Sequence, residues 1–234
     1  MKTTPYFEQV AEVLSPLNPR PMKTYRGKDI SDLENIKVEI MEQKMRCFEA
    51  DKLDRIVLLK NDIADGSFVV WVIAIVPSDE YPLPTFFSEI LHRMSDIKVR
   101  ADFYPPADCV QDWDYFEKFM MPMEPVWEKH KDLEGAGMER LAWARVLGSP
   151  FHAFGKFPVN DTIKKTAVDI TIDYLKLYVK LWQETEKADR TYMAALNKRK
   201  ELILKKFSEK DPARGPLEKT LGKEKADRLM ELLF

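Results

Sequence analysis

The stretch FVVWVIAIVP, from Phe68 to Pro77, contains nine consecutive apolar residues and ends at a proline. A membrane-spanning helix needs about 20 apolar residues, so this stretch is too short to cross a bilayer. Its many Val and Ile residues favour a β-strand. Alternate side chains of a strand point to opposite faces, so both faces of this strand would be apolar. We therefore predict the central strand of a sheet that is covered by helices on both sides.

Further strands are predicted next to this one in the sequence. Ile56–Leu59 is apolar, and the turn signal Asp65–Gly66 separates it from the central strand. The simplest interpretation is an antiparallel hairpin of Arg55–Lys60 with Phe68–Val76. Lys98–Phe103 alternates in polarity and predicts another strand. Sequential antiparallel strands differ from the parallel sheet of a nucleotide-binding fold.

Glu89 follows the central strand closely and is the main candidate for chemistry. Pro82 and Pro84 form a rigid connector, and Thr85 is then predicted to cap a helix that has Glu89 in its first turn. A carboxyl group among Phe86, Phe87 and Ile90 would be desolvated, which raises its pKa. The alternative is a solvated carboxylate that the helix dipole favours.

Apolar residues at spacings of three and four predict several more helices. The longest begins at the Asn160–Thr162 start signal and extends to about Glu186. The others are Pro5–Leu14, Met138–Gly148, Tyr192 to about Glu209, and Leu217–Leu233 with an interruption near Gly222.

Composition excludes several common classes of protein. The net charge of −2 provides no overall positive field for nucleic acid. Cys47 and Cys109 have no CxxC spacing, which argues against a disulfide framework or a zinc knuckle. Dinucleotide-binding, Walker and HExxH motifs are absent from the sequence. The opening MKTTPYFEQV has no signal-peptide core, and the chain has no linker, so we expect one cytoplasmic domain over residues 1–234 and no membrane partner.

Three segments resemble the ferredoxin-dependent bilin reductases, in the same order and spacing. KDPARGPLEKTLGKEKADRLMELLF (Lys210–Phe234) is similar to the C-terminus of that family. YPLPTFFSEI (Tyr81–Ile90) resembles its Leu-Pro-x-Phe-x-x-Asp stretch, and Gly148–Pro158 with IDYLKLYVKLWQ resembles its loop and long helix. The similarity is strongest to the members that make phycocyanobilin, from which this chain is divergent.

The resemblance implies a three-layer α/β/α sandwich with a central antiparallel sheet flanked by helices. It also implies that an open-chain tetrapyrrole, biliverdin or a related bilin, lies between the sheet and the C-terminal helices. Members of the family take single electrons from a reduced 2Fe–2S ferredoxin, a transient partner, and hold no bound metal or flavin. The protein would then supply proton donors and position. A monomer that acts in phycobilin biosynthesis is expected.

The resemblance also assigns roles to individual residues. Glu89 falls at the catalytic Asp of the family, and Asp211 resembles a family carboxylate near the pocket; the alternative for Asp211 is a helix cap that pairs with Arg214. Lys210 and Arg214 adjoin it as candidate substrate contacts. Lys156 and Arg55 are candidates for binding the bilin propionates, although solvated surface cations are the common alternative.

This sequence departs from the family at titratable positions. The phycocyanobilin-forming enzymes carry a His on the central strand, and counting back from Pro77 places Val72 there. Their His and Glu on the preceding strand fall at about Arg55 and Val57. The departures leave room for a two-electron reduction that uses Glu89 and Asp211, or for a bilin-binding protein without reductase activity.

Two surface hypotheses complete the predictions. The aromatic and Met-rich segment Trp113–Trp127 could serve a protein-interaction module, although such a stripe is more often core. A basic helix face could dock an acidic ferredoxin, although a face of this kind is usually only solvated. Its residues are Lys198, Arg199, Lys200, Lys205 and Lys206.

Overall fold

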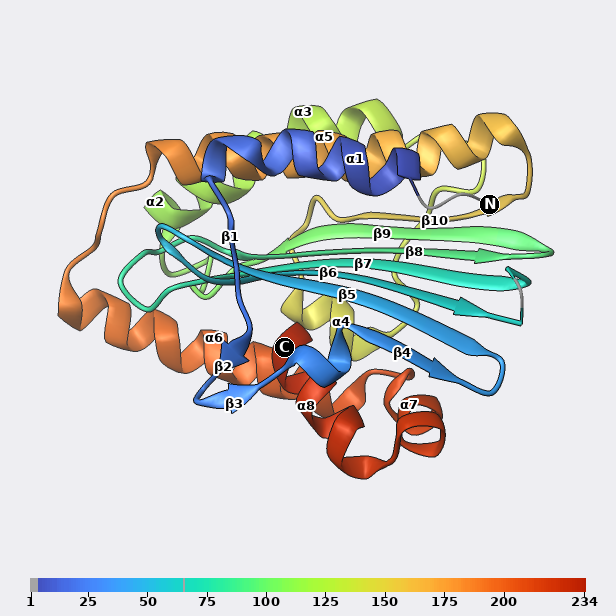
Figure 1. The fold of residues 1–234 in the computed structure, drawn as a ribbon. Helices are drawn as coiled ribbons and strands as arrows, with labels where there is room; N and C mark the ends of the chain where they lie inside the picture. The colour runs from blue at the N-terminus through green and yellow to red at the C-terminus, as the bar shows by residue number, and fades with distance from the viewer. Residues whose placement is uncertain (1–3, 65) are drawn as a thin grey trace.

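A computed structural model of the protein describes residues 4–64 and 66–234, and its centre is an antiparallel sheet with helices on both faces (Figure 1). The predicted three-layer α/β/α arrangement is confirmed. The eight strands have the order β1-β5-β6-β7-β8-β9-β10, and β4 pairs with β5 beside β1. Their bounds are β1 (Arg20–Pro21), β4 (Asn35–Val38), β5 (Met41–Ala50), β6 (Leu53–Ile63), β7 (Phe68–Pro77), β8 (Thr85–Arg93), β9 (Asp96–Tyr104) and β10 (Ala153–Pro158). A small second sheet pairs β2 (Thr24–Tyr25) with β3 (Lys28–Asp29).

Strand β7 is buried on both faces, as its sequence predicts. Its residues Trp71, Ile73 and Ile75 belong to one apolar cluster, and Val72 and Ala74 belong to another on the opposite face. The predicted antiparallel pairing of β6 with β7 is also confirmed. The turn signal at Asp65–Gly66 includes Asp65, which lies outside the described residues.

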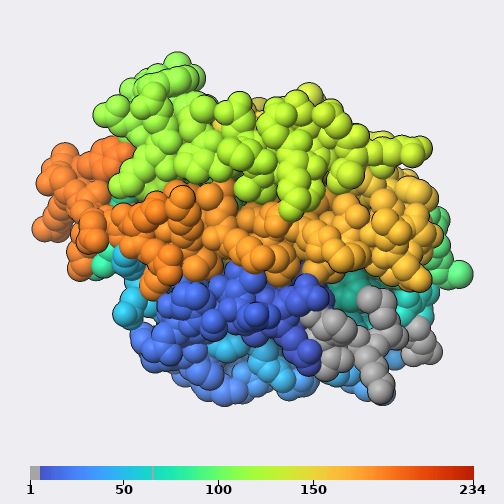
Figure 2. Space-filling view, turned by 90° about the horizontal axis from the view of Figure 1, so that it is seen from above, coloured from blue at the N-terminus to red at the C-terminus, as the bar shows by residue number. Residues whose placement is uncertain are grey.

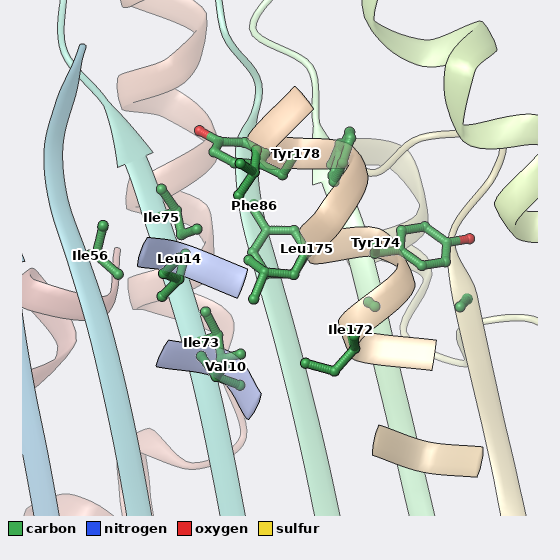
Figure 3. Packing of buried hydrophobic residues seen from close by; sticks show 14 of the residues in the cluster. Val10, Leu14, Ile56, Ile73, Ile75, Phe86, Ile172, Tyr174, Leu175 and Tyr178 are labelled. Atoms are coloured by element: carbon green, nitrogen blue, oxygen red, sulfur yellow. The ribbon is translucent and has the colours of Figure 1, made fainter. Parts of the chain in front are cut away.

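One face of the sheet is covered by α1 (Thr4–Leu14) and α5 (Asp161–Glu184), which lie side by side (Figures 1 and 2). The Asn160 side chain caps α5 by accepting a hydrogen bond from the amide of Ile163, at 2.8 Å. Figure 3 shows residues of α1 and α5 packed on β7 and β8. Burial of these side chains on folding is the main stabilising contribution to this layer.

The aromatic segment after β9 adds to the same layer and forms a chain of short helices. These are α2 (Trp113–Tyr115), a π-helical turn (Phe116–Met120), a 3₁₀ turn (Met121–Met123) and α3 (Glu124–His130). Tyr115, Phe119, Met120 and Met123 are buried in the core. These residues of the segment that suggested a protein-interaction module are therefore core packing, whereas Trp113 and Met121 are exposed.

The other face of the sheet is covered by the C-terminal helices (Figure 1). They are α6 (Arg190–Lys210), α7 (Arg214–Leu221) and α8 (Lys223–Leu233), with α4 (Ala142–Leu147) beside them. Phe207 of α6 packs against Phe87 of β8 and against the terminal Phe234. Two further 3₁₀ turns, Ser15–Leu17 and Ser31–Leu33, lie in the N-terminal region.

The predicted helix that begins at Thr85 is wrong, because residues Thr85–Arg93 form strand β8. Phe86 and Ile90 face α5, whereas Phe87 faces the C-terminal helices, so both faces of this strand are buried. A strand that is apolar on both faces lacks the alternation of a half-buried one, and its spacing can also fit a helical stripe. The hydrogen bonds that β8 makes with β7 and β9 decide in favour of the strand.

Candidate functional site

A cavity of about 520 Å³ lies between the sheet and the C-terminal helices. Its sheet side is lined by residues of β5 to β10, and its other side by residues of the segment before α4, the α6–α7 connection, α7 and the end of α8. Most of this lining is apolar and includes Leu59, Val72, Phe87 and Phe234. The charged residues that line it are Glu89, Arg93, Lys98, Arg100, Glu139, Arg140, Lys156 and Asp211.

Glu89 enters this cavity from the middle of the sheet. It pairs in register with Val72 of β7 on one side and with Arg100 of β9 on the other. The Glu89 side chain is 13% exposed, and its Oε2 lies 3.3 Å from Nη2 of Arg100 and 3.9 Å from Nζ of Lys98. The apolar surroundings expected for Glu89 are therefore present on one side only, because two cations lie on the other side.

Arg100 and Glu139 are components of the site that the sequence did not reveal. The Arg100 side chain lies above the ring of Phe87, 5.0 Å from its centroid, and its Nη1 is 3.5 Å from Oε2 of Glu139. A signal existed in the strand KVRADF, where Arg100 occurs between Val99 and Ala101. Such alternation usually marks a solvated face, so only the helices packed above it identify Arg100 as buried.

Asp211 reaches the same cavity from the end of α6. Its Oδ1 accepts a hydrogen bond from the amide of Ala213, at 2.7 Å, so it orders the connection to α7. Burial raises the pKa of Asp211, and the negative charge of Glu89 raises it further. An acid with a raised pKa is suited to proton donation near neutral pH.

The remaining predicted site residues divide into two groups. Lys156 of β10 lines the cavity and is half-exposed, with its Nζ 3.6 Å from Oδ2 of Asp96. Lys210 is exposed at the end of α6. Arg214 binds Ser208, Glu218 and Asp227, so it links α6, α7 and α8. The structure thus brings Glu89, Val72, Lys156 and Asp211 together at the cavity and assigns Arg214 to helix packing.

The predicted propionate contact at Arg55 is wrong, because this side chain is buried beneath the end of α8. It is 2% exposed, and its Nε donates a 2.6 Å hydrogen bond to the carbonyl oxygen of Leu232. Its Nη1 donates to the hydroxyl of Tyr25, at 2.8 Å, and to the carboxylate of Asp54. Arg55 therefore joins the N-terminal segment, the sheet and the last helical turn.

Replacing Arg55 with leucine is expected to lower the free energy of unfolding by about 2–3 kcal/mol, because the Leu232 carbonyl loses its buried donor. Urea denaturation measures the change. The matched control is Arg20→Leu, whose side chain is half exposed in a surface pair with Glu49, and it should change stability by less than about 1 kcal/mol. Unchanged stability of Arg55→Leu together with weaker bilin binding would instead support a propionate contact.

Val72 and Val57, the two valines at positions that depart from the family pattern, lie in different surroundings. Val72 lines the cavity next to Glu89, its partner on the neighbouring strand. Val57 pairs with Ala74 and is fully buried beneath the helices, whereas Leu59 is the residue of β6 that pairs with Val72 and lines the cavity. Of the two valines at family positions, Val72 therefore lines the cavity and Val57 does not.

The basic face of α6 also needs a correction. Lys198, Arg199 and Lys205 are exposed, as a docking surface requires. Lys200 is buried, and its Nζ donates to the carbonyl oxygen of Pro77, at 3.1 Å, and to Oδ1 of Asp79, at 2.6 Å. Lys200 therefore anchors α6 to the end of β7. Among the described residues, no helix is both long and apolar enough to span a bilayer.

Comparisons with known proteins agree with this fold. The family model for ferredoxin-dependent bilin reductases matches residues 11–234. The crystal structure of phytochromobilin synthase from tomato in complex with biliverdin is similar in fold, with a TM-score of 0.81 and 19% sequence identity, over 96% of this chain and 80% of that one. No protein with a curated description matches the chain in sequence.

Proposed function

Because the chain belongs to the ferredoxin-dependent bilin reductases, we propose that it reduces biliverdin or a related linear tetrapyrrole with electrons that a reduced ferredoxin delivers one at a time. One observation carries the proposal: Glu89 and Asp211, which are far apart in the sequence, line the same cavity between the sheet and the C-terminal helices. A carboxyl group in each wall could deliver a proton to a pigment held between them.

The proton chemistry is assigned to these two carboxyl groups. Asp211 has a raised pKa, so its carboxyl group keeps its proton to a higher pH than an ordinary aspartate, and we assign the first proton to it. Glu89 is paired with Arg100 and Lys98. We assign the second proton to the carboxyl group of Glu89, which lines the same cavity as Asp211. Two electrons and two protons together reduce one double bond.

The cations around the cavity support recognition of an anionic pigment. Arg93, Lys98 and Lys156 are partly exposed residues of its lining. They suit the two propionate groups of a bilin, since a basic side chain attracts a carboxylate at an exposed rim. The apolar lining from Leu59, Phe87 and Phe234 suits the flat faces of the pyrrole rings.

A second candidate is a bilin-binding protein without reductase activity. The observation in its favour is that Val72 and Leu59 are the lining residues nearest to Glu89 on β7 and β6, and neither can donate or accept a proton. Such a protein would hold the pigment and leave its double bonds unchanged.

One experiment distinguishes the two candidates. The purified protein is titrated with biliverdin while its visible spectrum is recorded, and reduced 2Fe–2S ferredoxin is then added under anaerobic conditions. The expected result is binding, followed by loss of biliverdin and appearance of a reduced bilin in the extracted pigment. Binding without conversion supports the second candidate for this substrate, and lack of binding contradicts both.

The ferredoxin is expected to dock on the exposed basic residues of α6, among them Lys198, Arg199 and Lys205. An acidic partner would associate with such a face more slowly as salt screens the charges. The cytoplasmic location and the monomeric state stay predictions from the sequence.

A further inference from the structure

Arg100 has hydrogen-bonding capacity that the described part of the chain does not use. Its side chain is buried, with 4% of the residue exposed, and it lines the cavity beside Glu89. Within residues 4–64 and 66–234, Nε has no hydrogen-bond partner, and Nη1 has only an ion pair with Oε2 of Glu139, at 3.5 Å, that does not meet hydrogen-bond geometry. A guanidinium group carries five N–H donors, and leaving them unpaired in a buried place costs free energy. Because Arg100 lines the cavity, an acceptor on a ligand there could satisfy the N–H groups that the described residues leave without a hydrogen bond.

The surroundings of Arg100 hold its charge in a fixed place. Glu89 lies 3.3 Å from Nη2, Glu139 lies 3.5 Å from Nη1, and the ring of Phe87 lies beneath the guanidinium. Cation–π contact and two carboxylates offset the cost of burying the cation. A charge that is held before the ligand arrives needs no reorganisation during a reaction.

We propose that Arg100 donates hydrogen bonds to a lactam oxygen of the bilin and stabilises the negative charge that forms there when an electron arrives. This inference rests on the proposed function. The depth of Arg100 favours a lactam oxygen over a propionate, because the propionates can pair with the more exposed cations Lys98 and Lys156. Val72, on the other side of Glu89, offers no hydrogen-bond donor from its side chain.

The step balances in electrons and protons. A ferredoxin loses one electron and the bilin gains it, so the pigment becomes a radical anion whose charge is shared with the lactam oxygen. Arg100 keeps all its protons, because a guanidinium is not deprotonated in proteins. The O–H bond of the Asp211 carboxyl group breaks, its proton moves to the bilin, and the carboxylate regains a proton from solvent.

The test compares Arg100→Gln with wild type on two substrates: biliverdin, and biliverdin dimethyl ester, whose propionates carry no charge. If Arg100 binds a lactam oxygen, the substitution lowers single-turnover reduction by about 10²-fold on both substrates. The absorption band of the bound pigment should also shift relative to wild type. Arg100→Lys keeps the charge and should recover part of the rate. Arg20→Gln, an exposed arginine outside the cavity, is the control and should leave the rate unchanged.

Each other outcome decides the matter. If Arg100→Gln lowers the reduction rate with biliverdin but not with its dimethyl ester, the proposal is overturned in favour of a propionate contact. An unchanged rate with both substrates would also overturn the proposal. Failure of the wild-type protein itself to bind or convert biliverdin would instead contradict the proposed function. If Arg100→Gln does not fold, the double variant Arg100→Gln, Glu139→Gln is used, because it also removes the buried carboxylate that would have lost its cation. The same two substrates are then compared with this variant.

Discussion

Asp211→Asn is expected to lower the rate of bilin reduction by about 10²–10⁴-fold, the usual range for loss of a positioned proton donor. Asparagine can still accept the hydrogen bond from the amide of Ala213, so the turn between α6 and α7 should be kept. It has no proton to donate at neutral pH. The measurement is a single turnover with reduced ferredoxin under anaerobic conditions. The reaction is monitored through the decrease in biliverdin absorbance.

A measurement of biliverdin binding distinguishes a loss of proton donation from misfolding of the variant. The Asp211→Asn variant should bind biliverdin about as well as wild type, because the shape of the cavity is unchanged. Asp51→Asn, an exposed aspartate far from the cavity lining, is the matched control and should turn over normally. A wild-type rate in Asp211→Asn would show that the proton comes from another group.

The same variant also has an expected effect on stability that depends on pH. The pKa of Asp211 is raised in the folded state, first by burial and then by the charge of Glu89. The stability that protonation contributes is thus fully present below the unfolded-state pKa and is lost as the pH rises through the folded-state pKa. Asparagine stays neutral, so Asp211→Asn should gain stability relative to wild type when the pH is raised from about 3, below the ordinary aspartate pKa of 3.8, to about 7, as measured by urea denaturation at these two pH values. An equal difference at both pH values would contradict the raised pKa.

The sequence predicts the parts of this fold that have one dominant cause. Phe68–Pro77 is apolar on both faces, so a covered central strand follows directly, and the Asn160 cap with its long apolar stripe predicts α5. The sequence wrongly predicts a helix from Thr85, because the apolar spacing of Thr85–Arg93 fits both a helix and a doubly buried strand. The choice depends on hydrogen bonds to β7 and β9, which are contacts between strands that local sequence does not encode.

The candidate site shows the same division. Glu89, Lys156 and Asp211 were found through the resemblance, and the cavity brings them together. Arg55 was misassigned because a basic residue at a strand end is usually solvated, whereas here Tyr25 and Leu232 enclose it. Both partners are distant in the sequence, so nothing near Arg55 indicates its burial. Arg100 was missed for the same reason.

Glu89→Gln is expected to lower turnover by about 10²–10⁴-fold, because glutamine cannot supply the second proton. The change also leaves the buried Arg100 without the closer of its two carboxylate partners, so the unfolding free energy should fall by about 1–3 kcal/mol. Biliverdin binding should persist. The matched control is Glu12→Gln, an exposed glutamate on α1, which should change neither quantity.

The pH dependence of the residual activity in Glu89→Gln tests the coupling between the two carboxyl groups. The negative charge of Glu89 is one cause of the raised pKa of Asp211, so its removal should lower that pKa. Because the protonated form of Asp211 is the active one, the rate falls as the pH rises through its pKa, and this fall should begin at a lower pH in the variant. The measurement is the single-turnover rate from pH 5 to pH 9 in both proteins. A normal rate would refute proton donation by Glu89, and a reduced rate with an unshifted profile would show that the two carboxyl groups act independently.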